Sequence, residues 1–243
     1  LRIRLDHALY MRGFTDQIDD ALPLIMSGRI KLPGLKKSPT PGLIISIDAK
    51  INLEQDNFYV SRGGEKLSNS IKYFNLSILN LICMDVGAST GGFTDVLLQN
   101  GVEKIYAVDV GYGQLHEKLL NNSKVVSMER KNARYLNTKD VPQLIDILVC
   151  DASFISLRKI LPEPIKLCAK NAKLVALIKP QFEVGKKNIS KGGVVKDEDL
   201  RNKCCEEIRL WLEITMKWNV HSIIESPIRG AKGNIEYLIY ANK

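Results

Sequence analysis

The sequence predicts an α/β protein whose main part is a doubly wound, mostly parallel sheet, preceded by a small α+β unit. Short apolar runs alternate with helical segments from residue 59 onward, and polar residues follow the ends of these runs. The last two apolar runs flank a loop that contains proline and glycine, which predicts a closing antiparallel hairpin. A chain of 243 residues, 45% hydrophobic, can form a large and a small domain, which we place at residues 59–243 and 1–58.

The composition predicts a basic, soluble protein. Its net charge of +8 favours a polyanionic partner such as nucleic acid, although many basic enzymes have no such partner. No apolar run approaches the roughly 18 residues that span a bilayer, and no charged-then-apolar leader opens the chain, so we expect a cytoplasmic location. The cysteines form no C-x-x-C pair and the histidines are scattered, so neither a disulfide framework nor a metal site is predicted.

Two short helices and a strand are expected in the first unit. Gly13 and Gly28 punctuate the helices, and a turn at residues 39–42 precedes an alternating segment at 43–51. The apolar stripes of the two helices consist of Leu5, Leu9 and Tyr10, and of Ile18, Ala21, Leu22 and Ile25. This order resembles the S4 RNA-binding domain, which presents a basic helix pair to structured RNA. Here residues 15–20, expected in the second helix, are acidic instead.

The S4 resemblance implies that basic residues of the first unit contact RNA. The candidates are Arg4, Arg29, Lys31, Lys36 and Lys37. The last four of them fall together without an intervening acid, which suits contacts with phosphates. A solvated run of charges has the same pattern, and the residues alone do not separate the two readings.

Five parallel strands and the two strands of the hairpin are expected in the second unit, which makes a sheet of seven. Their ranges are residues 81–86, 105–110, 125–128, 144–150, 174–178, 220–225 and 235–241. Ligands of open parallel sheets bind beyond the carboxyl ends of the strands. Asp85, Asp109, Asp151 and Lys179 lie at four such ends and are expected to line one crevice.

A glycine-rich turn at residues 87–92 joins an apolar strand to a helix, as in proteins that hold a nucleotide-like cofactor. Ser89 stands where the dinucleotide motif has its second glycine, and Asp85 would repel phosphates but attract a sulfonium. We therefore favour S-adenosylmethionine over NAD, with Asp109 as acceptor for the ribose diol. Similar turns also occur in α/β proteins without a cofactor. The expected cofactor-binding residues are Asp85, Gly87, Ser89, Thr90, Gly91, Gly92, Phe93, Asp109, Val110 and Asp151.

Four charged residues are candidates for the chemistry: Lys66, Asp151, Lys179 and Glu236. Lys179 follows five apolar residues, where an unpaired ammonium is costly to bury, unless it simply extends into solvent at the strand end. Methyl transfer to a ribose hydroxyl requires an in-line approach and loss of the hydroxyl proton. Lys179 can either accept that proton or stabilise the developing alkoxide, while carboxylates orient the lysines. Both roles remain open at this point.

Other methyl acceptors require residues that this chain lacks at the expected places. Enzymes that methylate base amines usually carry Asn or Asp, two prolines and an aromatic residue after the fourth strand, whereas residues 151–154 are Asp-Ala-Ser-Phe. Methylation of cytosine C5 needs a thiolate, and Cys150 lies within an apolar strand. A hydroxyl acceptor fits best.

Six segments together resemble the TlyA (hemolysin A) family, which joins an S4 domain to an FtsJ-type, Rossmann-like methyltransferase. They are residues 61–67, 85–95, 106–115, 153–157, 179–183 and 191–195. The resemblance covers nearly the whole chain. It implies 2′-O-methylation of ribosomal RNA, at cytidines in the best-known members, by a Lys-Asp-Lys-Glu tetrad formed here by Lys66, Asp151, Lys179 and Glu236. It also implies that Asn132 lies near the adenine of the donor.

Further RNA contacts are expected at Arg62 and in the basic loop of residues 185–193, through Lys186, Lys187 and Lys191. An ordinary surface loop is the alternative. The family name records hemolysis, so a membrane-acting cytolysin is a second reading, although no long amphipathic or spanning segment is visible. A catalytically silent RNA-binding protein is a third, against which all four tetrad residues are present.

Overall fold

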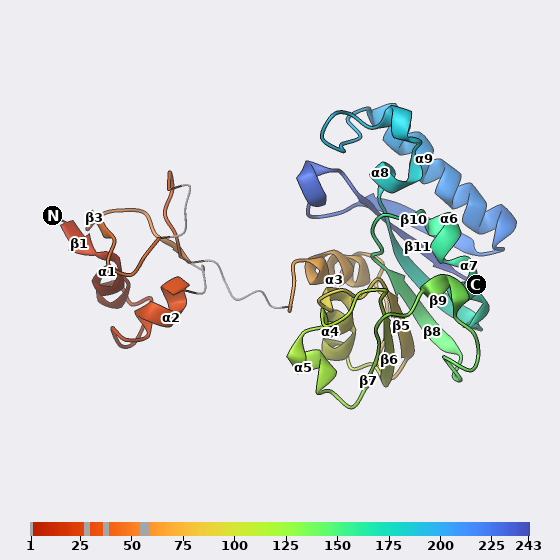
Figure 1. The fold of residues 1–243 in the computed structure, drawn as a ribbon, viewed down its shortest axis with the longest axis horizontal. Helices are drawn as coiled ribbons and strands as arrows, with labels where there is room; N and C mark the ends of the chain where they lie inside the picture. The colour runs from red at the N-terminus through yellow and green to blue at the C-terminus, as the bar shows by residue number, and fades with distance from the viewer. Residues whose placement is uncertain (1, 27–29, 36–38, 54–58) are drawn as a thin grey trace. The chain divides into compact units, whose positions relative to one another are not determined.

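The computed structural model describes residues 2–26, 30–35, 39–53 and 59–243 (Figure 1). The chain divides into two compact units, Leu1–Phe58 and Tyr59–Lys243, which are described separately below. Within the described part of the chain, no helix has the length and apolar character needed to cross a membrane.

The first unit packs two short helices against two small antiparallel pairs of strands. Its elements are β1 (Arg2–Arg4), α1 (Leu5–Met11), α2 (Ala21–Met26), β2 (Ile30–Lys31), β3 (Ile44–Ser46) and β4 (Asn52–Leu53). Strand β1 pairs with β3, and β2 pairs with β4. The side chains that form its core are Leu5, Ala8, Leu9, Ala21, Ile25, Ile30 and Ile45.

Three expectations for the first unit are wrong in detail. Helix α2 begins only at Ala21, so the acidic residues 15–20 lie in turns before it and not in a helix. Because α2 has fewer than two turns, it buries Ala21 and Ile25, four residues apart, while Ile18 and Leu22 are exposed, as is Tyr10 in α1. Of the expected strand at 43–51 only Ile44–Ser46 forms one, β3, because a turn closed by the Ala49 amide and the Ser46 carbonyl ends it; β4 begins after the expected range.

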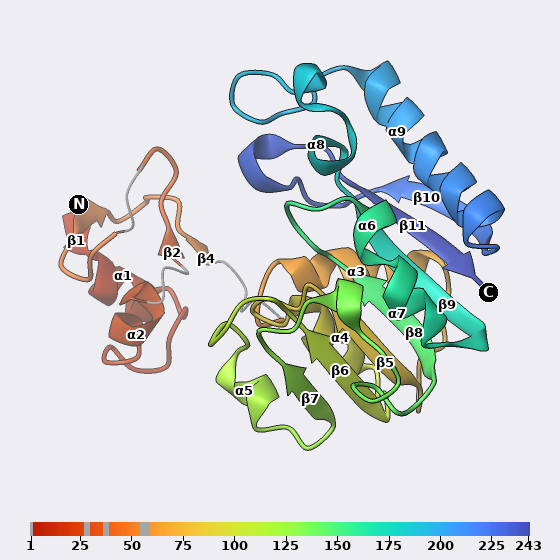
Figure 2. The same ribbon diagram turned by 45° about the vertical axis from the view of Figure 1, so that its right-hand side comes forward.

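The second unit contains the predicted seven-stranded sheet. Its strands are β5 (Ile82–Val86), β6 (Lys104–Val108), β7 (Val125–Met128), β8 (Ile145–Cys150), β9 (Cys168–Ile178), β10 (Asn219–Glu225) and β11 (Tyr237–Asn242). They lie in the order β10-β11-β9-β8-β5-β6-β7 (Figure 2). Strands β5 to β9 run parallel, and β11 lies antiparallel between β9 and β10. The predicted doubly wound sheet with a closing hairpin is confirmed.

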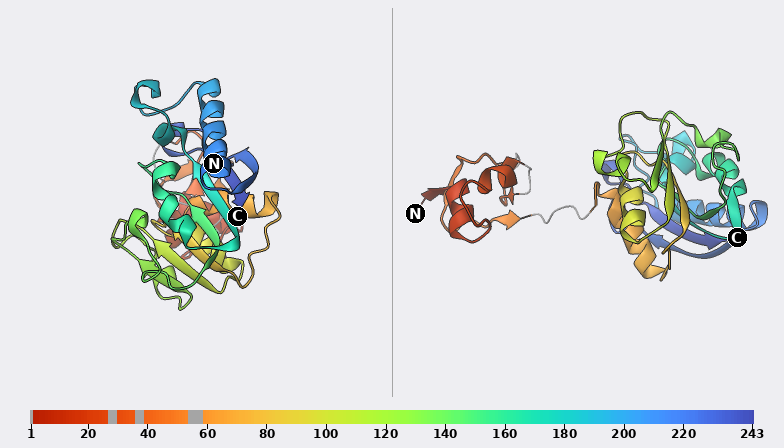
Figure 3. Two further views of the ribbon diagram at one scale, coloured as in Figure 1. Left: turned by 90° about the vertical axis from the view of Figure 1, so that its right-hand side faces the viewer. Right: turned by 90° about the horizontal axis from the view of Figure 1, so that it is seen from below.

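Helical segments connect these strands. They are α3 (Gly63–Tyr73), α4 (Gly92–Gln99), α5 (Glu117–Leu120), η1 (Ala133–Tyr135), α6 (Leu157–Ile160), α7 (Pro162–Lys166), α8 (Pro180–Glu183), η2 (Lys186–Asn188), α9 (Glu198–Leu210), η3 (Trp211–Thr215) and η4 (Ala231–Gly233). Helices cover both faces of the sheet (Figure 3). Alternate residues of β8 show why this is needed: Ile147 and Val149 pack with α3 and α4, whereas Leu148 and Cys150 pack with α6, α7 and α9.

Candidate active site

Two adjoining cavities lie beyond the carboxyl ends of the parallel strands. The first has a volume of about 690 Å³ and the second about 570 Å³. Both are lined by Gly87, Ser89, Asp151, Ser153 and Phe154. These five residues form a common wall of the two cavities.

The loop after β5 approaches this wall closely because it contains Gly87. This residue has φ +83°, and a Cβ on it would lie 2.8 Å from Cα of Ala152. Glycine is therefore required both by the backbone conformation and by the contact with the loop after β8. Ser89, Thr90, Gly92 and Phe93 also line the first cavity, as the sequence suggested. Gly91 lines neither cavity; with φ +96° it turns the chain into α4 against Leu115 and Leu119.

Asp85 lies elsewhere than expected. It is fully buried and lines neither cavity, because the alternation of β5 directs it to the face that α4 covers. Its Oδ2 accepts a hydrogen bond of 2.7 Å from the hydroxyl of Thr94 in α4. Burial raises the pKa of Asp85 to about 7. We therefore assign it to the support beneath the glycine-rich loop and withdraw the expectation that it lines the crevice.

Asp109 joins the loops after β5 and β6 at the second cavity. Its Oδ2 accepts a hydrogen bond from the Ser89 amide (2.8 Å), and its Oδ1 accepts one from the Gly111 amide (2.7 Å). Each carboxylate oxygen keeps a second acceptor site, as binding of a vicinal diol requires. Asn132 and Val110 line the same cavity, and Val110 is largely exposed. The fold thus brings these three expected cofactor residues to one cavity.

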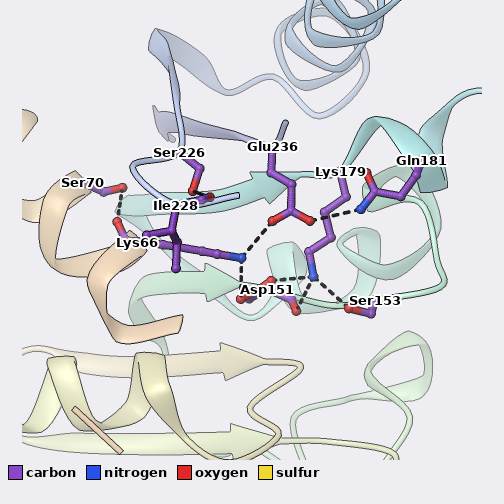
Figure 4. A network of polar contacts seen from close by, with 9 residues as sticks. All are labelled: Lys66, Ser70, Asp151, Ser153, Lys179, Gln181, Ser226, Ile228 and Glu236. Atoms are coloured by element: carbon purple, nitrogen blue, oxygen red, sulfur yellow. Dashed lines mark hydrogen bonds and ion pairs between the residues drawn. The ribbon is translucent and has the colours of Figure 1, made fainter. Parts of the chain in front are cut away.

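The four candidate catalytic residues form a chain of alternating charges on the wall of the first cavity (Figure 4). Lys66 from α3 places its Nζ 2.8 Å from Oε2 of Glu236 and 3.7 Å from Oδ2 of Asp151. Lys179, directly after β9, places its Nζ 2.6 Å from Oδ1 of Asp151. The two ammonium groups and two carboxylates compensate one another, which is what allows them to be buried.

Lys179 does not extend into solvent. Its side chain is only 8% exposed. Besides the ion pair with Asp151, its Nζ donates to the hydroxyl of Ser153 (2.8 Å) and to the Asp151 carbonyl (3.2 Å). Three oxygen atoms thus hold this side chain against the common wall and fix the position of its Nζ.

Glu236 is held by residues that the sequence analysis missed. Gln181 donates from Nε2 to Oε1 of Glu236 (3.1 Å), and a Cβ on Gly230 would overlap the same oxygen. Gln181 stands two residues after Lys179 within the segment 179–183, so its closeness to the site could have been anticipated. The sequence gives no indication of Gly230, because its role depends on a contact with Glu236 that forms only in the folded chain.

Unpaired cations also line the first cavity. Arg62, Arg229 and Lys232 have side chains without a hydrogen-bond or ion-pair partner in the described part of the chain. Arg62 was expected to contact RNA, whereas Arg229 and Lys232 were not predicted. Lys187 and Lys191 are exposed but do not line this cavity.

Only two of the five basic residues expected to contact RNA in the first unit lie within the described residues. Arg4 is engaged in an ion pair with Asp6 at 2.6 Å, and Lys31 lies in β2. Arg29, Lys36 and Lys37, and the side chain of Lys186, lie outside the described residues. Of the four cations expected to fall together, the described residues include Lys31.

Attack by a thiolate and catalysis by a metal ion lack suitable residues in the part of the chain that the structure describes. Burial raises the pKa of Cys150 to about 12, so it is a poor source of thiolate. The five cysteines are buried and free. Among the described residues, no group of three or more metal-binding side chains could hold a metal ion.

This combination defines the class of protein. A parallel sheet closed by an antiparallel hairpin, with the Asp109 carboxylate at one strand end and a charged network at the next cavity, fits the architecture of a Rossmann-like methyltransferase. The model of the FtsJ-like methyltransferase family matches residues 59–243.

Relatives agree over nearly the full chain. Hemolysin A of Brachyspira hyodysenteriae is 42% identical over 98% of this chain and 99% of that protein. The 16S/23S rRNA (cytidine-2′-O)-methyltransferase TlyA of Mycobacterium tuberculosis is 37% identical over 98% of this chain and 89% of that protein. A solved candidate hemolysin from Streptococcus thermophilus is 38% identical with a TM-score of 0.77, over 100% of this chain and 88% of that one.

The chain therefore belongs to the FtsJ-like methyltransferase family, in its TlyA (hemolysin A) group. The resemblance seen in the sequence is confirmed. As an enzyme of this family it uses S-adenosylmethionine as methyl donor.

Proposed function

We propose that this protein methylates the 2′-hydroxyl of a cytidine in ribosomal RNA. The observation that carries the proposal is the network of Lys66, Asp151, Lys179 and Glu236 at the wall between two cavities. One cavity suits the nucleoside half of the donor and the other suits the acceptor ribose. The cytidine-2′-O-methyltransferase named above supplies the acceptor class and the nucleotide.

The residues of the second cavity fit the donor's adenosine. Asp109 would accept hydrogen bonds from the ribose diol, with Val110 and Asn132 next to the adenine. Gly87, Ser89 and Asp151 lie where the other half of the donor would reach the common wall. When bound, the donor supplies a methyl group activated by its sulfonium.

Lys179 acts on the acceptor hydroxyl in this proposal. Because Asp151 and Ser153 hold its ammonium in one place, it can orient the 2′-oxygen and stabilise negative charge that develops there. This favours the positioning role over that of general base. Lys66 and Glu236 fix Asp151 in turn, so the whole network positions one cation.

The unpaired cations Arg62, Arg229 and Lys232 favour an RNA substrate. The charges of the tetrad compensate one another, which leaves these three to attract anions at the first cavity. The phosphates that flank a target ribose are such anions. We also propose that residues 1–58 form an S4-like RNA-binding unit, with Lys31 among its contacts.

The test is transfer of radiolabelled methyl groups to ribosomal subunits, followed by mapping of blocked ribose positions in RNA from cells with and without this gene. We expect one or a few cytidines to lose their block when the gene is absent. An unchanged map, together with no transfer by the purified protein, would refute the proposal. Leakage of liposomes caused by the purified protein would instead favour the cytolysin reading.

A further inference from the structure

Gln181 lines the first cavity without being a member of the tetrad. It is the second residue of α8, is 8% exposed and lines the cavity two residues after Lys179. Its Nε2 donates a hydrogen bond of 3.1 Å to Oε1 of Glu236 (Figure 4). Buried amides are costly unless their hydrogen bonds are made, so this position calls for an explanation.

Glu236 has one partner for each carboxylate oxygen. Oε2 accepts from Lys66 at 2.8 Å, and Oε1 accepts from Gln181. If the amide were absent, Lys66 would be the one hydrogen-bond partner of the Glu236 carboxylate left among the described residues. Gln181 therefore fixes the plane of the carboxylate that holds Lys66, which in turn lies 3.7 Å from Asp151.

The orientation of the amide follows from its partner. A carboxylate only accepts hydrogen bonds, so the nitrogen of Gln181 must face Glu236 and the oxygen must face away. Oε1 of Gln181 is buried and receives no hydrogen bond from the described residues. Because this oxygen is buried, an occupant of the cavity does not reach it, and Gln181 acts on the site through its Nε2.

We propose that Gln181 is a fifth functional residue of this site, which positions Glu236, and through it Lys66, by the hydrogen bond from its Nε2. The inference rests on the proposed function, because it names a residue that positions the network of the same site. If the tetrad worked equally well without Gln181, loss of the hydrogen bond to Oε1 of Glu236 would leave the rate unchanged.

Two variants separate this role from packing. Gln181→Met keeps the size of the side chain but cannot donate to Glu236, and we expect kcat on ribosomal RNA to fall about 10- to 100-fold with donor affinity unchanged. Gln181→Glu places two carboxyl groups in contact, which share a proton at low pH and repel each other once both are ionised. Its activity relative to wild type should be highest near pH 6 and fall about 10-fold by pH 9.

The measurements are kcat and KM for RNA between pH 6 and 9, donor binding by calorimetry and the thermal midpoint Tm. Gln143→Met is the matched control, because Gln143 also forms a side-chain hydrogen bond, to Tyr106, but lines neither cavity. Wild-type kcat in Gln181→Met, or a Gln181→Glu profile parallel to wild type, would overturn the inference. Failure of the wild-type protein to methylate RNA would refute the proposed function instead.

Discussion

At the scale of single residues, the site depends on charges that compensate one another. Lys179 can be buried because Asp151, Ser153 and a carbonyl hold it, and Lys66 can be buried because Glu236 and Asp151 do. Removal of one member of such a network leaves its partner uncompensated, which typically costs about 3–5 kcal/mol for fully buried pairs. Asp151 is somewhat exposed, so we expect a smaller loss of stability there.

Lys179→Ala should abolish methyl transfer while leaving donor binding unchanged, because Lys179 lies at the common wall and outside the lining of the second cavity. Transfer to ribosomal RNA and calorimetric binding of the donor measure the two effects separately. Lys170→Ala, at an exposed position of β9, is the control and should keep full activity. Near-normal turnover of Lys179→Ala would remove this residue from the mechanism.

Asp85 should make the stability of the protein depend on pH. Its pKa is raised to about 7 in the folded state by burial, so the folded protein binds a proton that the unfolded chain releases near pH 4. The free energy of unfolding should therefore fall as pH rises from 4 to 7, by an amount on the order of 3 kcal/mol. Asp85→Asn keeps an acceptor for Thr94 and should remove this dependence.

Urea unfolding of both proteins at pH 4.5 and 7.5 checks the expectation for Asp85. Relative to wild type, the free energy of unfolding of Asp85→Asn should be higher at pH 7.5 than at pH 4.5. Equal pH dependence of the two proteins would show that Asp85 is ionised when folded.

At the scale of elements, the strands were predicted better than the short helices. Runs such as residues 81–86 and 144–150 match β5 and β8 to within one residue, since strands covered on both faces are continuously apolar. Strand β9 begins six residues before the expected 174, because its first half carries exposed Lys170 and Asn171. Polar side chains at an irregular part of the sheet hide a strand from sequence analysis.

The loop between β10 and β11 gives a prediction at this scale. Gly230 has φ −73°, which alanine adopts readily, but a Cβ there would overlap the Glu236 carboxylate. Gly230→Ala should therefore displace that side chain without unfolding the protein, and lower kcat about 10-fold or more with little change in Tm. Gly185→Ala is the control, because nothing lies within 4 Å of its added Cβ. Unchanged kcat in Gly230→Ala would show that the position of Glu236 does not limit the rate.

At the scale of the whole molecule, the sequence already indicates an excess of positive charge. The net charge of +8 indicated an anionic partner, and the second unit directs three unpaired cations to the first cavity. Such charges contribute to RNA affinity by releasing counterions, which makes binding sensitive to salt.

The double variant Arg229→Ala, Lys232→Ala should raise KM for RNA and leave kcat and donor affinity unchanged. The slope of log affinity against log salt should become shallower by roughly 1 for each phosphate that is no longer neutralised. Lys203→Ala, on an exposed position of α9, is the control. If binding by the double variant depends on salt as steeply as binding by wild type, these two cations face solvent and do not contact RNA.

Local periodicity and turn chemistry were enough to predict the order of strands and helices, the glycine-rich loop and the strand ends that carry Asp109, Asp151 and Lys179. Which side chains meet at the site depends instead on contacts between segments far apart in the chain. The hydrogen bond from Lys66 to Glu236 joins residues 170 positions apart, through a strand order in which β11 inserts beside β9. Gly230 and Arg229 were identified in the same way, and Asp85 proved to lie away from the crevice, since contact and burial depend on packing between distant segments.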